Sequence, residues 1–302
     1  MPQLSTKLRI RLQLAVCLLL LDLTSVRAQF LLRTNGEPTA VGPGRIAGGG
    51  TVAVRALANQ VNDPTAPLTL VQFRNVVAPS ISGYSGAGNV LQVEPVFPIF
   101  PSRLLPFEQL VKMTLPFPTT PNPGRETGFG DLQFFDLVSI KQSWGRWGVG
   151  PMFVFPTATS ASLGQGKWQA GPAVGAIYTG FKGLQLGGVV QNSTSFAGNS
   201  RRPNVNALTI GPTLTYNLPH GWFAGYSDFD WTFDWANGGA VTIPVGLQVG
   251  KVFSIGKVPV SFSIESAYNV VRPSGAGVPE WLVCLELTVI FKTYREARRG
   301  LP

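Results

Sequence analysis

Apolar and polar residues tend to alternate along the chain from residue 68 onward. Segments with this period of two are separated by breaks rich in glycine and proline. Twelve such segments can be counted, most of them slightly longer than the roughly 9–11 residues that a tilted strand needs to cross a bilayer. They cover residues 68–77, 88–98, 104–115, 130–142, 146–157, 167–179, 184–195, 205–217, 222–235, 241–254, 258–271 and 280–292.

The clearest alternation lies in the ninth segment, 222–235. We interpret its two faces as one that meets lipid and one that meets water. The predicted lipid face carries Phe223, Phe229, Trp231, Phe233 and Trp235, and the predicted water face carries Tyr226, Asp228, Asp230, Thr232 and Asp234. Segments 205–217, 258–271 and 280–292 repeat the pattern.

The links between these segments alternate in length. Short turns at 143–145, 180–183, 218–221 and 255–257 lie between longer, more polar links at 118–129, 158–166, 196–204 and 272–279. Short periplasmic turns and long external loops are typical of bacterial barrels with an even strand count. In hydrocarbon every backbone donor and acceptor must be paired, so strands span a membrane only as a closed cylinder.

The pattern therefore predicts an all-β fold, a transmembrane antiparallel up-and-down β-barrel of about 12 strands. A soluble β-sandwich or a secreted barrel is the alternative, in which the aromatic stripe would be buried in a core. Charged residues make up only 13% of the chain, against roughly 25% in soluble proteins. The 35 glycines and 25 prolines disfavour helices and fit many short strands joined by turns.

Residues 1–28 have the parts of a secretory signal peptide, with a basic start, an apolar centre and cleavage predicted after Ala28. Residues 29–67 are irregular and are predicted to form a periplasmic arm or a lumen plug. Residues 68–292 are assigned to the barrel and residues 293–302 to a charged C-terminal tail. Cys284 is then the only cysteine of the mature chain, which excludes an intramolecular disulfide.

The formal charge of +9 falls to 9 − 3 = +6 without the leader. These charges are scattered, and no basic run is interleaved with aromatics, so nucleic acid is not a predicted partner.

The sequence contains few candidate residues for catalysis or for metal binding. The single histidine, His220, lies in a tight turn, which leaves neither a nucleophilic triad nor a histidine-based zinc site. Asp228, Asp230 and Asp234 are alternate residues of one strand, about 6–7 Å apart, which suits a hydrated face better than a metal site. We therefore predict no enzymatic activity, no cofactor and no metal.

The charged residues on the predicted inner faces form a candidate lumen lining. They are Glu94, Glu108, Lys112, Asp228, Asp230, Asp234, Glu265 and Glu286. Carboxylates outnumber the single lysine in this set, and rings of carboxylates favour cations. The lining therefore predicts a preference for cations.

Several segments resemble a known family of outer-membrane transporters. They are GFGDL at 128–132, PTATSASLGQGKWQAGPAVGAIY at 156–178, YNLPHGWF at 216–223, IPVGLQVGKVF at 243–253, and KVP at 257–259 followed by AYNVVRP from 267. The family is the one labelled "MetA-pathway of phenol degradation", some of whose members are misnamed neuromedin U. The resemblance spans most of 89–292 and implies a barrel that transports small organic molecules, without catalytic residues to transfer.

The function predicted from these observations is a passive outer-membrane pore of a Gram-negative bacterium for small aromatic or hydrophobic solutes. The alternative is a structural or adhesive surface barrel with a filled lumen. The expected partners are outer-membrane lipid, a small-molecule solute and the barrel-assembly machinery, and the oligomeric state is left open.

Overall fold

The computed structural model describes residues 61–103, 106–256, 258–275 and 277–291. The chain divides into two units, residues 1–46 and 47–302, and every described residue belongs to the second. The predicted signal peptide, the arm up to residue 60 and the charged tail lie outside the described residues.

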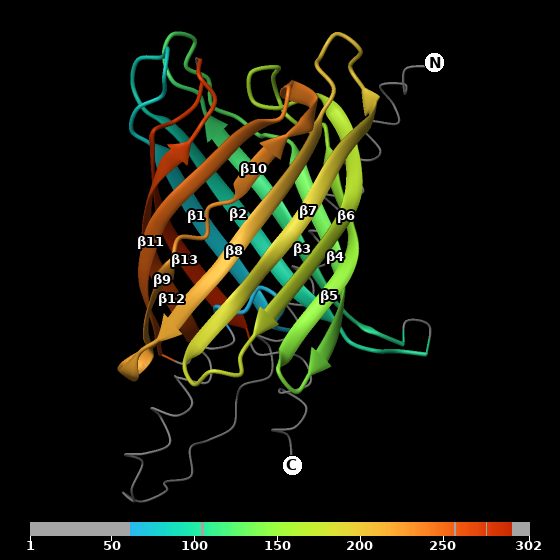
Figure 1. Ribbon diagram of the computed structural model, residues 1–302, viewed down its shortest axis with the longest axis vertical. Coiled ribbons are helices and arrows are strands. Elements are labelled where there is room, and N and C mark those ends of the chain that lie inside the picture. Colours follow the sequence, from blue (N-terminus) through green and yellow to red (C-terminus); the bar gives the residue numbers. More distant parts are fainter. Residues whose placement is uncertain (1–60, 104–105, 257, 276, 292–302) are drawn as a thin grey trace, which may run out of the picture. The chain divides into compact units, whose positions relative to one another are not determined.

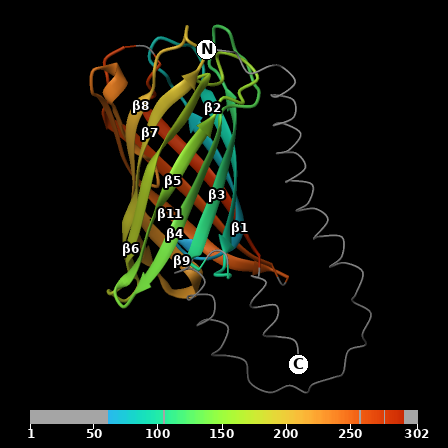
Figure 2. The ribbon, with the colours of Figure 1, turned by 90° about the vertical axis from the view of Figure 1, so that its right-hand side faces the viewer.

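The described residues form one antiparallel sheet that closes on itself (Figures 1 and 2). Its strands are β1 (Thr69–Ala78), β2 (Gly88–Ile99), β3 (Glu108–Thr119), β4 (Leu132–Gln142), β5 (Gly145–Phe155), β6 (Lys167–Tyr178), β7 (Leu184–Gly198), β8 (Asn206–Asn217), β9 (Trp222–Tyr226), β10 (Trp231–Asp234), β11 (Ala240–Ile255), β12 (Val258–Val271) and β13 (Trp281–Phe291).

The sheet is closed because β1 pairs with both β2 and β13. Thr69 lies opposite Phe291 and Val77 opposite Val283 along this seam. Strands β9 and β10 both lie between β8 and β11, so they occupy one position in the wall. The wall thus has twelve positions, and the predicted twelve-stranded antiparallel barrel is confirmed.

The links divide between the two ends of the barrel. Two residues join β4 to β5 and two join β11 to β12, at the end where β1 begins and β13 finishes. The links β3–β4, β5–β6 and β12–β13 at the other end are longer (Figure 1). Two short 3-10 helices, η1 (Pro219–Gly221) and η2 (Trp235–Asn237), follow β8 and β10. Neither these helices nor any other in the described part of the chain is long and apolar enough to cross a membrane.

Large apolar side chains cover the outward face of the wall. Leu247 is 73% exposed, and Val249, Ile264 and Leu285 are also exposed. Their neighbours along the same strands point inward and are polar and buried, among them Gln248 and Glu265. An exposed apolar surface of this extent, alternating with a polar interior, fits contact with lipid hydrocarbon.

The prediction for the ninth segment was wrong at three residues. Phe223 points into the lumen, where it packs on Val252, and Phe229 packs on the inner-wall residues Ala267 and Cys284. Tyr226 lies opposite the outward-facing Leu247. The reason is the break at residues 227–230, which shifts the register against β8 by one residue. Even-numbered residues therefore point outward on β9, whereas odd-numbered residues point outward on β10.

Candidate functional site

A cavity of about 290 Å³ lies inside the barrel, and its lining comes from strands on all sides of the wall. Its charged lining residues are Asp63, Arg74, Glu94, Lys112, Asp228, Asp230 and Glu286. This lumen is the candidate functional site, since it gathers most of the inward-facing charges of the described residues.

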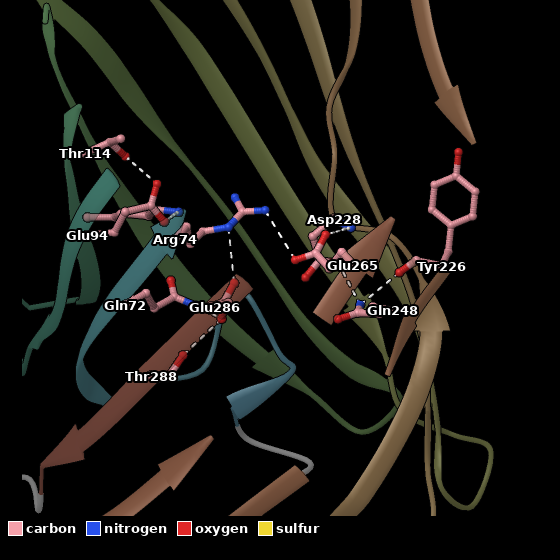
Figure 3. A network of polar contacts seen from close by, with 11 residues as sticks. Gln72, Arg74, Glu94, Thr114, Tyr226, Asp228, Gln248, Glu265, Glu286 and Thr288 are labelled. Atoms are coloured by element: carbon pink, nitrogen blue, oxygen red, sulfur yellow. Dashed lines mark hydrogen bonds and ion pairs between the residues drawn. The ribbon is translucent and has the colours of Figure 1, made fainter. Parts of the chain in front are cut away.

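Arg74 of β1 is the centre of the main polar network (Figure 3). Its Nε lies 3.1 Å from Oε2 of Glu286 on β13, and its Nη2 lies 3.5 Å from Oε1 of Glu265 on β12. Gln72 and Thr288 donate hydrogen bonds to Glu286, of 3.1 and 3.0 Å. One guanidinium therefore holds two carboxylates on the two strands beyond the closing seam.

A second ion pair lies beside this network on β2 and β3. Lys112 Nζ is 2.7 Å from Oε2 of Glu94, and the hydroxyl of Thr114 donates to Oε1 of the same glutamate at 3.0 Å. Glu94 is only 3% exposed, so this pairing is what offsets the cost of burying its charge.

The broken strand supplies two further carboxylates. The backbone N–H of Asp228 donates to Glu265 at 3.0 Å, and the side-chain amide of Gln248 donates to the Asp228 carboxylate at 3.1 Å. Gln248 also donates to the backbone oxygen of Tyr226 at 2.9 Å. Asp230 lies over Gly211, where a Cβ would stand 2.7 Å from its carboxylate oxygen. Both aspartates line the cavity.

The central network is thus negatively charged. It contains five carboxylates, of Glu94, Asp228, Asp230, Glu265 and Glu286, against the two cations Arg74 and Lys112, so its formal charge, with every group counted as ionised, is 2 − 5 = −3. Small cations gain from such a surface and small anions are repelled.

The eight residues predicted to line the lumen do not all meet here. Glu94, Lys112, Asp228, Asp230 and Glu286 line the cavity, and Glu265 joins the same network through Arg74. Glu108 stands at the first position of β3, away from this group. Asp234 ends β10, where its carboxylate accepts the N–H of Asn237 at 3.2 Å and caps η2.

Sequence reasoning missed Arg74, the most connected cation of the lumen. The available signal was the run Gln72, Arg74 and Val76 on alternate positions of β1, all of which face inward. The alternation of apolar and polar residues on β1 is weak, because the outward positions include the polar Asn75 as well as the apolar Val71.

Residues 61–66, which precede β1, lie inside the barrel near the end with the short turns. Asp63 Oδ2 is 3.1 Å from Nη1 of Arg146, which also donates to the backbone oxygen of Thr65. Asn62 donates to Asn217 at 3.1 Å, and Ala66 packs against Leu70 and other buried apolar residues. Burial raises the pKa of Asp63 above its usual value, although its bonds to Thr65 and the charge of Arg146 act in the opposite direction.

Exchanging Arg146 for glutamine is expected to weaken the attachment of residues 61–66 by about 1–3 kcal/mol, because Asp63 loses its charged partner. Limited proteolysis should then cut the segment before β1 faster than in the wild type. Lys141→Gln is the matched control, since Lys141 lies opposite Arg146 on β4 but is exposed. Equal cleavage of the two variants would show that the ion pair does not hold the segment.

The described residues offer little for metal chemistry. No group of three or more histidine, cysteine, aspartate or glutamate side chains within residues 61–291, as far as they are described, is arranged to hold a metal ion. His220 lies in the η1 turn with φ of 59°, a left-handed conformation outside the lumen network.

Solved structures with a similar fold are outer-membrane proteins. The COG4313 outer membrane channel from Pseudomonas putida F1 matches with a TM-score of 0.55 and 12% identity, over 74% of this chain and 94% of that one. At this identity the likeness shows the fold alone. No protein-family model and no curated protein matches the sequence.

Two further matches correct the prediction that the protein is not an enzyme. They are the outer membrane phospholipase A of Escherichia coli (TM-score 0.38, 10% identity, 82% of this chain and 99% of that one) and the Salmonella typhi phospholipase dimer (TM-score 0.36, 11% identity, 80% and 98%). Barrels matched by this chain therefore include enzymes, and the exclusion of catalysis is withdrawn. With TM-scores this low, neither match is an argument for a particular activity here.

Proposed function

We propose that the protein is a passive pore of the outer membrane for small solutes. The observation that supports this most directly is a cavity lined by charged side chains inside a closed barrel whose outer face is apolar. Charges in a protein interior are costly unless they are paired or hydrated. A barrel built only as a membrane anchor could fill its lumen with apolar side chains instead.

The outer membrane is the proposed location. The exposed apolar side chains of the wall support it, and so does the closed antiparallel fold, since barrels are the only β-structures that span membranes. Export through a signal peptide at 1–28 and insertion by the barrel-assembly machinery are the proposed route.

A preference for small cations is proposed from the formal charge of −3 in the central network. The proposed organic solutes, small aromatic or hydrophobic molecules, follow from the resemblance to the transporter family labelled "MetA-pathway of phenol degradation". The similar fold of an outer membrane channel is consistent with that resemblance.

Planar bilayers containing the purified protein test the pore. Steady single-channel conductance is the expected result, with a reversal potential in a salt gradient that has the sign of a cation preference. The absence of conductance at any voltage would favour a structural or adhesive barrel with a filled lumen. An anion preference would refute the selectivity and leave the pore standing.

A further inference from the structure

Between β8 and β11 the wall contains an interval that neither β9 nor β10 fills. Strand β10 pairs with β8 up to Trp231 opposite Ile210, and β9 resumes with Gly225 opposite Thr215. Residues 227–230 between them pair with neither neighbour in the regular ladder (Figure 1). On β8 the interval runs from Ile210 to Thr215, which is five residue steps, about 17 Å.

Two prolines border this interval. The N–H of Leu218 donates to Trp222 on β9, so even-numbered residues of β8, Pro212 included, direct their backbone polar groups toward the interval. The oxygen of Gly246 accepts the N–H of Ser227, so on β11 the same holds for Gly246 and Pro244. Proline has no N–H. The proline at each edge therefore has no backbone donor to leave unpaired toward the interval, and the oxygen of Pro244 accepts the Tyr226 hydroxyl.

The missing stretch of strand is folded into the lumen. Phe229 is 7% exposed and packs on Ala267 and Cys284 of the inner wall, while Asp228 is held by Glu265 and Gln248. Gly246 on β11 has no side chain to obstruct this path. These contacts keep Asp228 and Phe229 on the inner side of the wall, whereas Ser227 stays bonded to Gly246 on β11 and the Asp230 carboxylate lies over Gly211 on β8.

The cavity reaches the interval. Its lining includes Pro212 as well as the inward-facing neighbours Gly211 and Thr213. By its parity Pro212 belongs to the lipid face, with Leu214 and Tyr216, which are 46% and 49% exposed. A lipid-side residue therefore borders the lumen at this point.

An aromatic pair covers the interval on the lipid side. Tyr226 and Trp231 stand at its two ends, with ring centroids 6.5 Å apart and planes at 82°. The indole N–H of Trp231 donates to the Tyr226 hydroxyl at 3.1 Å, and that hydroxyl donates to the backbone oxygen of Pro244. The backbones of Tyr226 and Trp231 belong to the ladder at the two ends of the interval, and across the interval itself only their side chains are in contact.

We propose that this interval is a side exit between the lumen and the bilayer for uncharged aromatic solutes, with Tyr226 and Trp231 as its cover. The proposal rests on the pore proposed above and names a route for one class of its solutes. The inner end of the route lies beside the polar lumen, and its outer end opens among Val245 and Leu214 on the lipid face. An apolar solute gains free energy in moving from water into hydrocarbon, whereas an ion or polar solute loses it.

The test blocks the exit from outside. Val245→Cys places a thiol on the lipid face at the level of the interval, and Val249→Cys places one on the same face of β11 where β9 is paired with it. Both are labelled with a bulky maleimide, with the labelled wild type as baseline because Cys284 is fully buried. Entry of N-phenyl-1-naphthylamine into intact Gram-negative cells and ionic conductance in planar bilayers are then measured.

The expected result is a several-fold slower dye entry for the labelled Val245→Cys protein, with unchanged conductance, and no effect of the label at position 249. Unchanged dye entry at 245 in a conducting protein would overturn the side exit alone. Equal loss of dye entry and conductance would also overturn it, because the block would then lie in the lumen. A wild type without conductance would remove the pore itself.

A second variant acts in the opposite direction. Trp231→Ala removes half of the cover and is expected to raise dye entry several-fold, whereas Phe233→Ala on the same face of β10 is expected to leave it unchanged. Equal effects of the two substitutions would contradict a cover at Trp231.

Discussion

Replacing Arg74 with methionine is expected to lower the free energy of unfolding by about 3–5 kcal/mol, because a buried ion pair that loses one partner leaves uncompensated charge. The Glu265 side chain is fully buried and that of Glu286 is 13% exposed, and Arg74 is the cation that lies between them. The measurement is urea unfolding of the lipid-reconstituted protein, followed by tryptophan fluorescence.

The matched control is Arg272→Met. Arg272 pairs with Glu280 next to the link between β12 and β13, and the glutamate side chain is 44% exposed. Exposed pairs contribute about 0–1 kcal/mol, so this substitution should have little effect. A triple variant with Arg74→Met, Glu265→Gln and Glu286→Gln should recover part of the stability. If the single and triple variants were equally unstable, the loss would be one of packing rather than charge.

The double substitution Asp228→Asn and Asp230→Asn is expected to weaken the cation preference strongly. It changes the formal charge of the central network from −3 to −1, while the amide oxygen introduced at position 228 can still accept the bond from Gln248. At about 7 Å in water one carboxylate stabilises a cation and destabilises an anion by about 0.6 kcal/mol each, so removing two charges lowers the cation to anion ratio by up to about fiftyfold at low salt. Reversal potentials in a salt gradient measure this ratio.

Glu126→Gln is the control for the double substitution. Glu126 lies in the long link between β3 and β4, and the hydrogen bond from Ser162 holds its pKa below the usual value, so it is ionised at neutral pH. Removing this charge should leave the reversal potential unchanged. An unchanged potential in the double variant as well would mean that the ions do not pass Asp228 and Asp230.

The fold followed from the sequence because the alternation of side chains and the spacing of turns are local signals. Eleven of the twelve predicted segments correspond to single strands, with ends displaced by a few residues. The ninth does not, because the inward fold of residues 227–230 depends on contacts with Glu265, Ala267 and Cys284, which are distant in the chain. The alternation of Trp231 and Phe233 was interpreted correctly, but extending it back to Phe223 assumed an unbroken strand.

The lumen was harder to predict than the wall. Acidic residues on clean alternating strands could be assigned to the inside, but Arg74 stands on a strand whose two faces look alike in sequence. The contact between Asp63 and Arg146 joins residues 83 positions apart, and no local pattern indicates it. Glu108 and Asp234 have the right parity but stand at strand ends, where parity alone does not place a side chain in the centre.

The seam between β1 and β13 has a consequence for biosynthesis. It joins Thr69 to Phe291, so the first strand waits for its neighbour until 291 − 69 = 222 further residues have been made. Until then the first and the last strand of the sheet have an unpaired edge, and unpaired edges promote aggregation. Closure must therefore come after residue 291 has been made, and until then the two edge strands of the partial sheet need protection from pairing with other chains.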